Sequence, residues 1–96
     1  MRPSQALDLH RRAIRGIVER HHARNARVFG SVLRREDTEH SDLDLLVDPT
    51  PETTLMDIAA IQVEAEALLG VQVDVLTPKS LPTKFRERVL SEAVPV

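Results

Sequence analysis

The fold of this chain is decided by Val28-Phe29-Gly30-Ser31-Val32-Leu33-Arg34 and, after a polar loop, by Ser41-Asp42-Leu43-Asp44-Leu45-Leu46-Val47. Successive side chains of a strand point to opposite faces, so Asp42 and Asp44 are expected on one face of a strand over residues 42–47. Their Cα atoms then lie about 6.5–7 Å apart, which lets both carboxylates bind a pair of divalent cations. Carboxylates in an apolar strand are costly unless they are paired or bind metal, so the spacing favours a metal site. The alternative is that Asp42 caps a turn and Asp44 pairs with an arginine.

A third carboxylate is predicted to join this pair. Residues 71–76 alternate in polarity, which places Asp74 on the opposite face from the valines of the same strand. If this strand is a neighbour of residues 42–47, Asp74 converges with Asp42 and Asp44. Three carboxylates can hold two Mg²⁺ ions, which prefer oxygen ligands, and Asp74 can also accept the proton of an attacking hydroxyl. A single carboxylate on a strand is a weaker signal than a pair, so a structural role for Asp74 stays open.

Gly30 and Ser31 are predicted to bind phosphate. Glycine lets the backbone come close to an anion, and a short helix over residues 31–35 would present free N–H groups at its start. The Ser31 hydroxyl adds a donor, and Arg34, three residues further along the same helix face, can reach the same phosphates. Ser41 is expected to orient its neighbours by hydrogen bonds rather than to react, because no base is placed beside it.

The remaining pattern predicts a single α/β domain over residues 1–96, with a small mixed sheet of three to four strands flanked by helices. Helical spacing predicts a first helix over about 5–22, with Ser4 as its N-cap. A short strand is expected over 27–30 and a polar loop over 35–40. Thr54 and Asp57 form a capping box for a second helix, which Gly70 ends. A last helix over about 82–92 is expected to offer three apolar side chains to the core: Phe85, Val89 and Leu90.

Composition narrows the possible functions. The chain has 96 residues, no cysteine and a net charge of −2, and it lacks a run of about 18 apolar residues, so a soluble, cytoplasmic protein without membrane contact is expected. Phe29 and Phe85 are its only aromatic residues, which disfavours direct nucleic-acid binding by base stacking. The chain has no tyrosine, so any tyrosine that it modifies belongs to another protein. His40, the pair His21-His22 and Asp48 are expected to be solvated surface residues.

The spaced set of Gly30-Ser31, Arg34 and Ser41-Asp42-Leu43-Asp44 resembles the signature of the minimal nucleotidyltransferases, the smallest members of the DNA polymerase β-type nucleotidyltransferase superfamily. The resemblance covers nearly the whole chain and includes Asp74. It implies the nucleotidyltransferase fold, with Mg²⁺ held by Asp42, Asp44 and Asp74 and with the triphosphate of ATP held by Gly30 and Ser31. The sequence departs from the pattern at Arg35, where many relatives have glycine, so the path of the loop and the direction of Arg34 are open.

Members of this family commonly act as the antitoxin beside a HEPN-domain ribonuclease. The resemblance therefore implies transfer of AMP from ATP to a tyrosine of a HEPN toxin, in a hetero-oligomer with that toxin. Two alternatives stay open. The chain could neutralise its partner by binding alone, with the basic segment 10–27 as the docking face. It could also be a small-molecule nucleotidyltransferase, which is disfavoured because such enzymes usually carry an added substrate domain.

Overall fold

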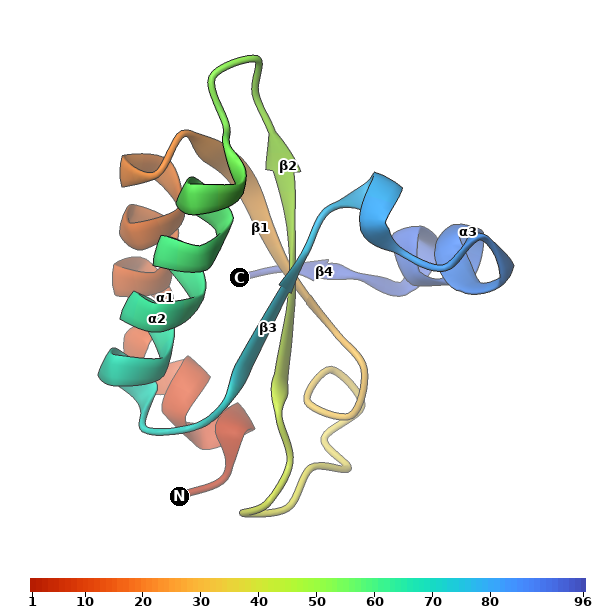
Figure 1. Cartoon of the computed structure of the whole chain (residues 1–96). Coiled ribbons are helices and arrows are strands. Elements are labelled where there is room, and N and C mark those ends of the chain that lie inside the picture. Colours follow the sequence, from red (N-terminus) through yellow and green to blue (C-terminus); the bar gives the residue numbers. More distant parts are fainter.

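The computed structural model describes all residues, 1–96. The chain begins with helix α1 (Pro3–Arg20), strand β1 (Ala23–Phe29) and strand β2 (Leu43–Pro49). Helix α2 (Leu55–Leu69), strand β3 (Val73–Leu76) and the short 3₁₀ helix η1 (Pro78–Ser80) follow, and helix α3 (Thr83–Glu92) and the short strand β4 (Val94–Pro95) end the chain (Figure 1). None of the helices is long and apolar enough to span a membrane.

The four strands form one mixed sheet in the order β3-β2-β1-β4. β1 runs antiparallel to β2 and to β4, whereas β2 and β3 are parallel and joined by α2. A bulge between Arg24 and Arg27 interrupts the pairing of β1 with β2, and Asn25 takes a positive φ of 55° there. The mixed sheet of four strands with flanking helices confirms the fold class predicted from the sequence.

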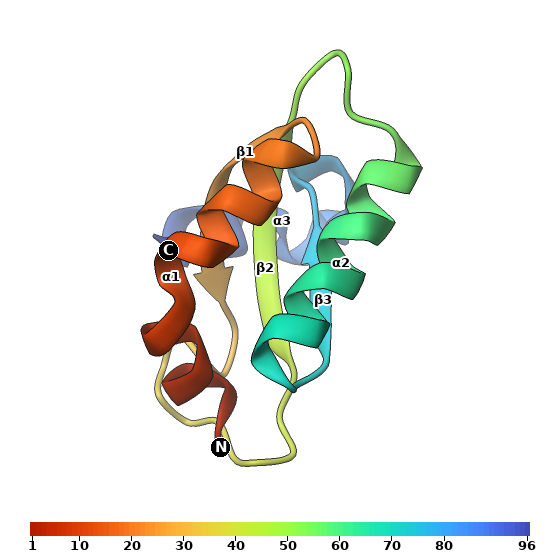
Figure 2. The ribbon, with the colours of Figure 1, turned by 90° about the vertical axis from the view of Figure 1, so that its left-hand side faces the viewer.

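The two faces of the sheet are covered differently. α1 and α2 lie side by side on one face, and α3 lies on the other side (Figures 1 and 2). Leu43, Leu45 and Val47 of β2 are completely buried in the hydrophobic core on the α1–α2 face. Because side chains alternate along a strand, Asp44 and Asp48 point to the opposite, more open face. This division leaves the carboxylates of β2 on the face that α1 and α2 do not cover.

The start of α1 differs from the prediction. α1 begins at Pro3 with Arg2 as its N-cap, so Ser4 is not the cap but lies inside the first turn, where it is buried. The backbone N–H of Ser4 donates to Oδ2 of Asp37 at 2.9 Å. Burial raises the pKa of Asp37, but the hydrogen bonds from Ser4 and from its own backbone, together with the charge of Arg2, lower the pKa below its ordinary value. A distant carboxylate therefore replaces the local cap, and it ties the loop before β2 to α1.

The predicted short helix over residues 31–35 is a turn. Arg34 N–H donates to the Gly30 carbonyl, but the pattern stops there, because Arg35 takes a left-handed φ of 58° that no helix continues through. The Arg35 guanidinium donates to Asp8 of α1 at 2.9 Å. This hydrogen bond, together with that from Arg11, lowers the pKa of Asp8. Position 35, where the family pattern predicts glycine, thus has the backbone conformation that favours glycine.

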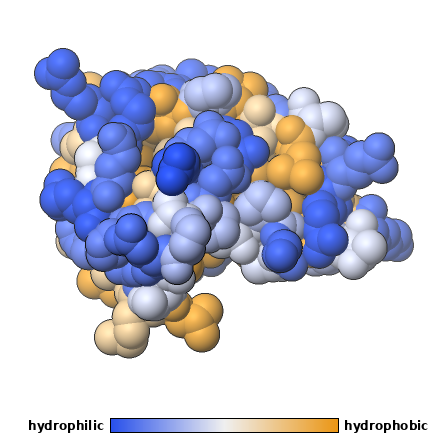
Figure 3. Space-filling model, turned by 90° about the horizontal axis from the view of Figure 1, so that it is seen from above, coloured by the Kyte–Doolittle hydropathy of each residue, from blue (hydrophilic) through white to orange (hydrophobic).

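α3 does not supply the core as predicted. None of its residues is buried: Phe85 is 46% exposed and Leu90 is 39% exposed, and Val89 is partly exposed. The apolar end of α2 is also open, with Leu55 88% and Met56 79% exposed. Figure 3 looks down on this end of the molecule and shows apolar atoms projecting from a largely polar outline. Helical spacing identified the apolar face of α3 but not what that face packs against.

The left-handed conformation of Arg35 predicts the outcome of two substitutions. Arg35→Gly and Arg35→Ala both lose the exposed ion pair with Asp8, but only glycine relieves the positive φ. We expect Arg35→Gly to be more stable than Arg35→Ala by about 1 kcal/mol in the free energy of unfolding, measured by urea denaturation. Arg34, which has no positive φ, is the control, and there alanine should be the more stable of the two. The same order at both positions would contradict this explanation.

Candidate active site

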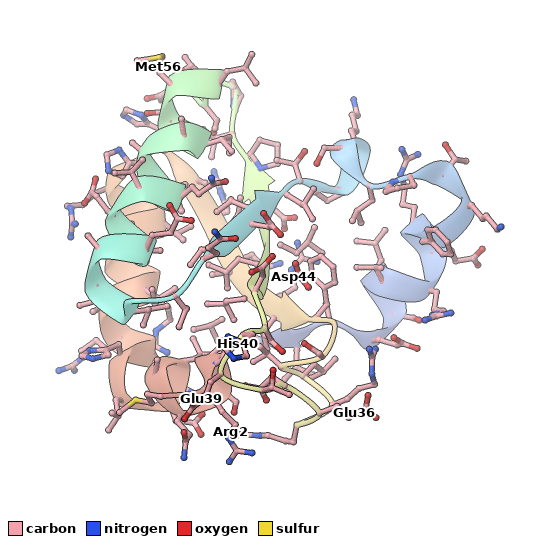
Figure 4. All side chains as sticks on the ribbon, turned by 60° about the horizontal axis from the view of Figure 1, so that its bottom comes forward. Arg2, Glu36, Glu39, His40, Asp44 and Met56 are labelled. Carbon is pink, nitrogen blue, oxygen red and sulfur yellow. The ribbon has the colours of Figure 1, made fainter.

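The strand register brings two of the predicted carboxylates into one row across the open face of the sheet. Asp44 on β2 is paired with Phe29 on β1 and with Asp74 on β3. Asp42 directly precedes β2 and lies two residues from Asp44. Figure 4 shows Asp44 near the middle of the sheet, between the α1–α2 layer and α3. The expectation that the strand of Asp74 lies beside that of Asp44 is therefore met.

Asp44 is the electrostatic centre of this row. Its pKa is raised from 3.8 to about 6, first because the half-buried carboxyl is removed from water. The negative charges of Asp74 and Asp42 raise the pKa further, and so does a hydrogen bond with Asp74 that favours the protonated form. The three carboxyl groups are thus close enough to repel one another. A positive charge placed among them would relieve this repulsion.

Gly30 makes room for Asp44. It has a left-handed φ of 77°, and a Cβ atom added there would lie 2.5 Å from Oδ2 of Asp44. Any other residue would therefore be strained in its backbone and would push the carboxyl group aside. Gly70 has a similar φ of 71° but no atom within 4 Å of the added Cβ. The close approach at Gly30 is thus specific to the carboxylate row.

The turn after Gly30 leaves backbone donors free. The N–H groups of Ser31, Val32 and Leu33 have no acceptor in the structure, whereas Arg34, Arg35 and Glu36 donate to carbonyl groups of the same turn. Consecutive free N–H groups form a concave site that suits an anion. The anion-binding role predicted for Gly30 and Ser31 therefore depends on a turn, without the dipole of a helix.

The other predicted residues lie around this centre in different ways. The Arg34 side chain forms an ion pair with Glu36, with 3.2 Å between Nε and Oε2. The Ser41 hydroxyl accepts the Thr38 N–H at 2.8 Å, and the orienting role of Ser41 stays a prediction. His40 is exposed on the loop before β2, as expected, and Figure 4 places it near the Glu39 side chain.

Three residues that were expected to be solvated form contacts with other side chains. Asp48 lies on the same face as Asp44 but forms an ion pair with Arg27 and accepts a hydrogen bond from Asn25. His21 pairs with Glu64, and His22 lies 3.3 Å from Asp57. Their partners come from distant parts of the chain, so only the fold reveals these contacts.

The carboxylates have the right chemistry for Mg²⁺, although they are not closed into a cage. No group of three or more acidic or histidine side chains is gathered tightly enough to hold a metal ion as it stands. The donors are nevertheless all carboxylate oxygens, which magnesium prefers, and their mutual repulsion raises the pKa of Asp44. A cation would replace that repulsion with attraction, so the residues present fit the ion.

Two hollows adjoin the site. One is an open depression lined by Asp42, Ser41 and Gln72, between the turns that precede β2 and β3. The other is an apolar groove of about 280 Å³ between the sheet and α3. Its walls come from both sides and include Phe29, Leu76, Leu81, Phe85 and Val89. Gly30 and Arg34 line the same groove, so it is continuous with the turn that presents the free N–H groups.

Comparisons with known proteins also find nucleotidyltransferases. A family described as polymerase beta, nucleotidyltransferase matches residues 12–96. MJ0435 of Methanocaldococcus jannaschii, provisionally named a protein adenylyltransferase, is 40% identical over 86 residues, which are 90% of this chain and 92% of the relative. The protein adenylyltransferase MntA of Thermococcus cleftensis is 38% identical over 88 residues, which are 92% and 86% of the two chains.

Solved structures agree on the fold. A chain provisionally described as a minimal nucleotidyltransferase superposes with a TM-score of 0.87 and 44% identity, covering 97% of this chain and 95% of its own. A chain from a toxin–antitoxin complex with AMP-PNP superposes with a TM-score of 0.71 over 97% of this chain and 71% of its own. Its identity is 14%, so it is similar in fold alone. These matches confirm the family resemblance and the fold inferred from the sequence.

The raised pKa of Asp44 predicts how stability depends on pH. The pKa is about 6 in the folded protein and near 3.8 when unfolded, so the folded state binds the proton more tightly. The contribution of Asp44 to the free energy of unfolding therefore falls as the pH rises from about 4 to 6. We expect Asp44→Asn to be more stable than the wild type at pH 7.5, by about 1 kcal/mol after allowance for solvent screening, and this gain to vanish near pH 4.

The measurement is urea denaturation of both proteins at pH 4, 6 and 7.5 without divalent metal. The readout is the difference between them, because other carboxylates affect the two proteins alike. Asp48→Asn serves as the control, since it removes a carboxylate from the same face that is paired with Arg27. It should lose stability at pH 7.5. A destabilised Asp44→Asn variant at pH 7.5 would show that the carboxyl groups do not repel one another.

Proposed function

This chain belongs to the polymerase beta nucleotidyltransferase family, and on that premise we propose that it transfers AMP from ATP to a hydroxyl group of a partner protein. The observation that carries the proposal is the crowding of Asp42 and Asp74 around Asp44, opposite the missing Cβ of Gly30. The names of two relatives as protein adenylyltransferases support a protein acceptor.

In the proposed reaction, the free N–H groups after Gly30 bind oxygens of the triphosphate, and Ser31 adds its hydroxyl. Asp42, Asp44 and Asp74 would hold Mg²⁺. When bound, Mg²⁺ would lower the pKa of the attacking hydroxyl and stabilise the charge on the leaving pyrophosphate. Asp74 is exposed on the edge strand β3, where it can take the proton from an incoming hydroxyl. A bond forms between that oxygen and the α-phosphorus as the bond to the β-phosphate oxygen breaks.

The acceptor is proposed to be a tyrosine of a HEPN-family toxin, which would make this chain the antitoxin of a hetero-oligomeric pair. The chain itself has no tyrosine, so the acceptor tyrosine must come from another protein. The toxin–antitoxin complex with AMP-PNP shares the fold of this chain, which supports both a toxin partner and an adenosine nucleotide. The cytoplasm, where ATP is available, is the proposed location.

Neutralisation of the partner by binding alone is the second candidate function. The structure gives less support to the basic segment 10–27 as its docking face than the sequence does. Arg11, Arg20 and Arg27 of the basic segment 10–27 are paired with acidic side chains of the same chain. Arg15 donates to the C-terminal carbonyl oxygen at 2.8 Å. Arg12 and Arg24 are exposed and have no charged partner, so the segment offers a partner fewer free charges than its sequence suggests.

Substitution of the carboxylates tests the proposed reaction. We expect Asp42→Asn and Asp44→Asn each to lower AMP transfer by at least about 10³-fold, because metal-held charge supplies most of the stabilisation of the transition state. The measurement is intact-mass spectrometry of the partner toxin after incubation with ATP and Mg²⁺. Asp48→Asn, on the same strand face but paired with Arg27, is the control and should retain transfer.

Two outcomes would contradict the proposal. The first is an unmodified toxin in the presence of the wild-type chain, ATP and Mg²⁺. The second is full protection of cells by an Asp42→Asn, Asp44→Asn double variant, which would support neutralisation by binding alone. In that case, reversing the charge of Arg12 and Arg24 should abolish protection if the basic segment is the docking face.

A further inference from the structure

The only two aromatic residues of the chain meet in one groove. Phe29 and Phe85 are more than half of the chain apart in sequence, yet both line the groove between the sheet and α3. Phe29 comes from the open face of the sheet, and Phe85 comes from α3, where it is 46% exposed. A domain of this size gains most by burying its aromatic rings in the core. Here both rings line a groove instead, which points to a ligand with an apolar, flat surface.

The groove begins where the phosphate-binding turn ends. Gly30 and Arg34 belong to that turn and also line the groove. Phe29 immediately precedes Gly30, and its register partner across the sheet is Asp44. Directly opposite residues of an antiparallel pair have Cα atoms about 4.5–5.5 Å apart. A molecule held at Asp44 and at the free N–H groups therefore lies beside Phe29, where the groove toward α3 begins.

The size and charge of the groove select one part of such a molecule. Its volume of about 280 Å³ lies near the lower limit of about 300 Å³ for small-molecule pockets, so it accommodates a ring system but not a whole nucleotide. Arg34 and Arg88 line it, Arg34 paired with Glu36 and Arg88 paired with Glu92, so the lining is mainly apolar with charged groups at its edge. The Lys84 ammonium lies 5.6 Å from the centre of the Phe85 ring. A planar, apolar ring fits this lining.

We infer that the groove binds the nucleobase of the triphosphate, with Phe85 and Phe29 as stacking residues that determine base preference. This inference rests on the proposed function, since it takes the phosphate end of the ligand to lie at the turn after Gly30. Stacking does not read the hydrogen-bonding edge of a base, and it is stronger for a larger ring. The groove therefore selects purine over pyrimidine nucleotides and separates ATP from GTP only weakly.

The same geometry gives α3 a function. α3 buries no residue in the core, and its side chains Phe85 and Val89 line the groove. A bound base fills the space between α3 and the sheet and adds the contacts that α3 lacks. Nucleotide binding is thus coupled to the packing of the C-terminal helix.

Binding measurements with the whole chain and Mg²⁺ distinguish binding of the base from binding of the phosphates. Isothermal titration calorimetry is made with ATP, CTP and inorganic tripolyphosphate, which has the phosphates but no base. We expect Phe85→Ala to weaken ATP binding about tenfold, which corresponds to about 1.4 kcal/mol of stacking, and to leave tripolyphosphate binding unchanged. The advantage of ATP over CTP should shrink in the same variant. Phe85→Leu, which keeps the apolar bulk, should lose less than Phe85→Ala.

The control is Leu90→Ala, which removes an exposed apolar side chain from the same helix but outside the groove. It should bind ATP as the wild type does. If Phe85→Ala binds ATP normally, the base is not in the groove, even though tripolyphosphate binding still supports the proposed function. If Phe85→Ala binds ATP normally but binds the partner protein more weakly, the groove binds a side chain of the partner and not the nucleobase. If the wild type binds neither ATP nor tripolyphosphate, both this inference and the proposed function are wrong.

Discussion

Repulsion among three carboxyl groups, held together by the register of the sheet, is the constraint on which the rest of the structure depends. β2 places Asp44 beside Asp74 of β3, and Asp42 directly precedes β2, near enough for its charge to raise the pKa of Asp44. Burial and the neighbouring negative charges raise the pKa of Asp44 to about 6, so its charged form is destabilised in the folded protein. The fold also keeps position 30 free of a Cβ atom, so that the carboxyl group fits. Such a conflict between stability and placement is typical of sites that bind a cation or carry out catalysis.

Much of this centre could be predicted from the sequence, because it depends on short-range rules. Asp44 and Asp74 lie side by side on the open face because side chains alternate along a strand, whereas Asp42, predicted on the same strand, lies just before β2. The parallel pairing of β2 with β3 is what a strand–helix–strand connection favours. The capping box of Thr54 and Asp57 is present at the start of α2 as predicted, because a cap depends only on neighbouring residues.

The features that the sequence did not reveal depend on contacts between distant residues. Ser4 looked like a local cap, but Asp37 reaches α1 from 33 residues away. The helix expected over residues 31–35 fails because Arg35 takes a left-handed conformation and is tied to Asp8. The apolar spacing of α3 predicted a helix correctly but not its surroundings, since periodicity says nothing about which surface lies opposite. As a result, Phe85 was assigned to the core although it lines a groove beside the site.

The most direct test of the account is a pH titration of the Asp44 side chain in the whole chain, monitored by the NMR signal of its carboxyl carbon with and without Mg²⁺. The account predicts a midpoint near pH 6 without metal, well above the ordinary value of 3.8, because the carboxyl group is half-buried and faces Asp74 and Asp42. Saturating Mg²⁺ should move the midpoint below 3.8, because the cation favours the charged form. A midpoint near 3.8 that Mg²⁺ does not change would contradict the central claim that crowded carboxylates form a cation site.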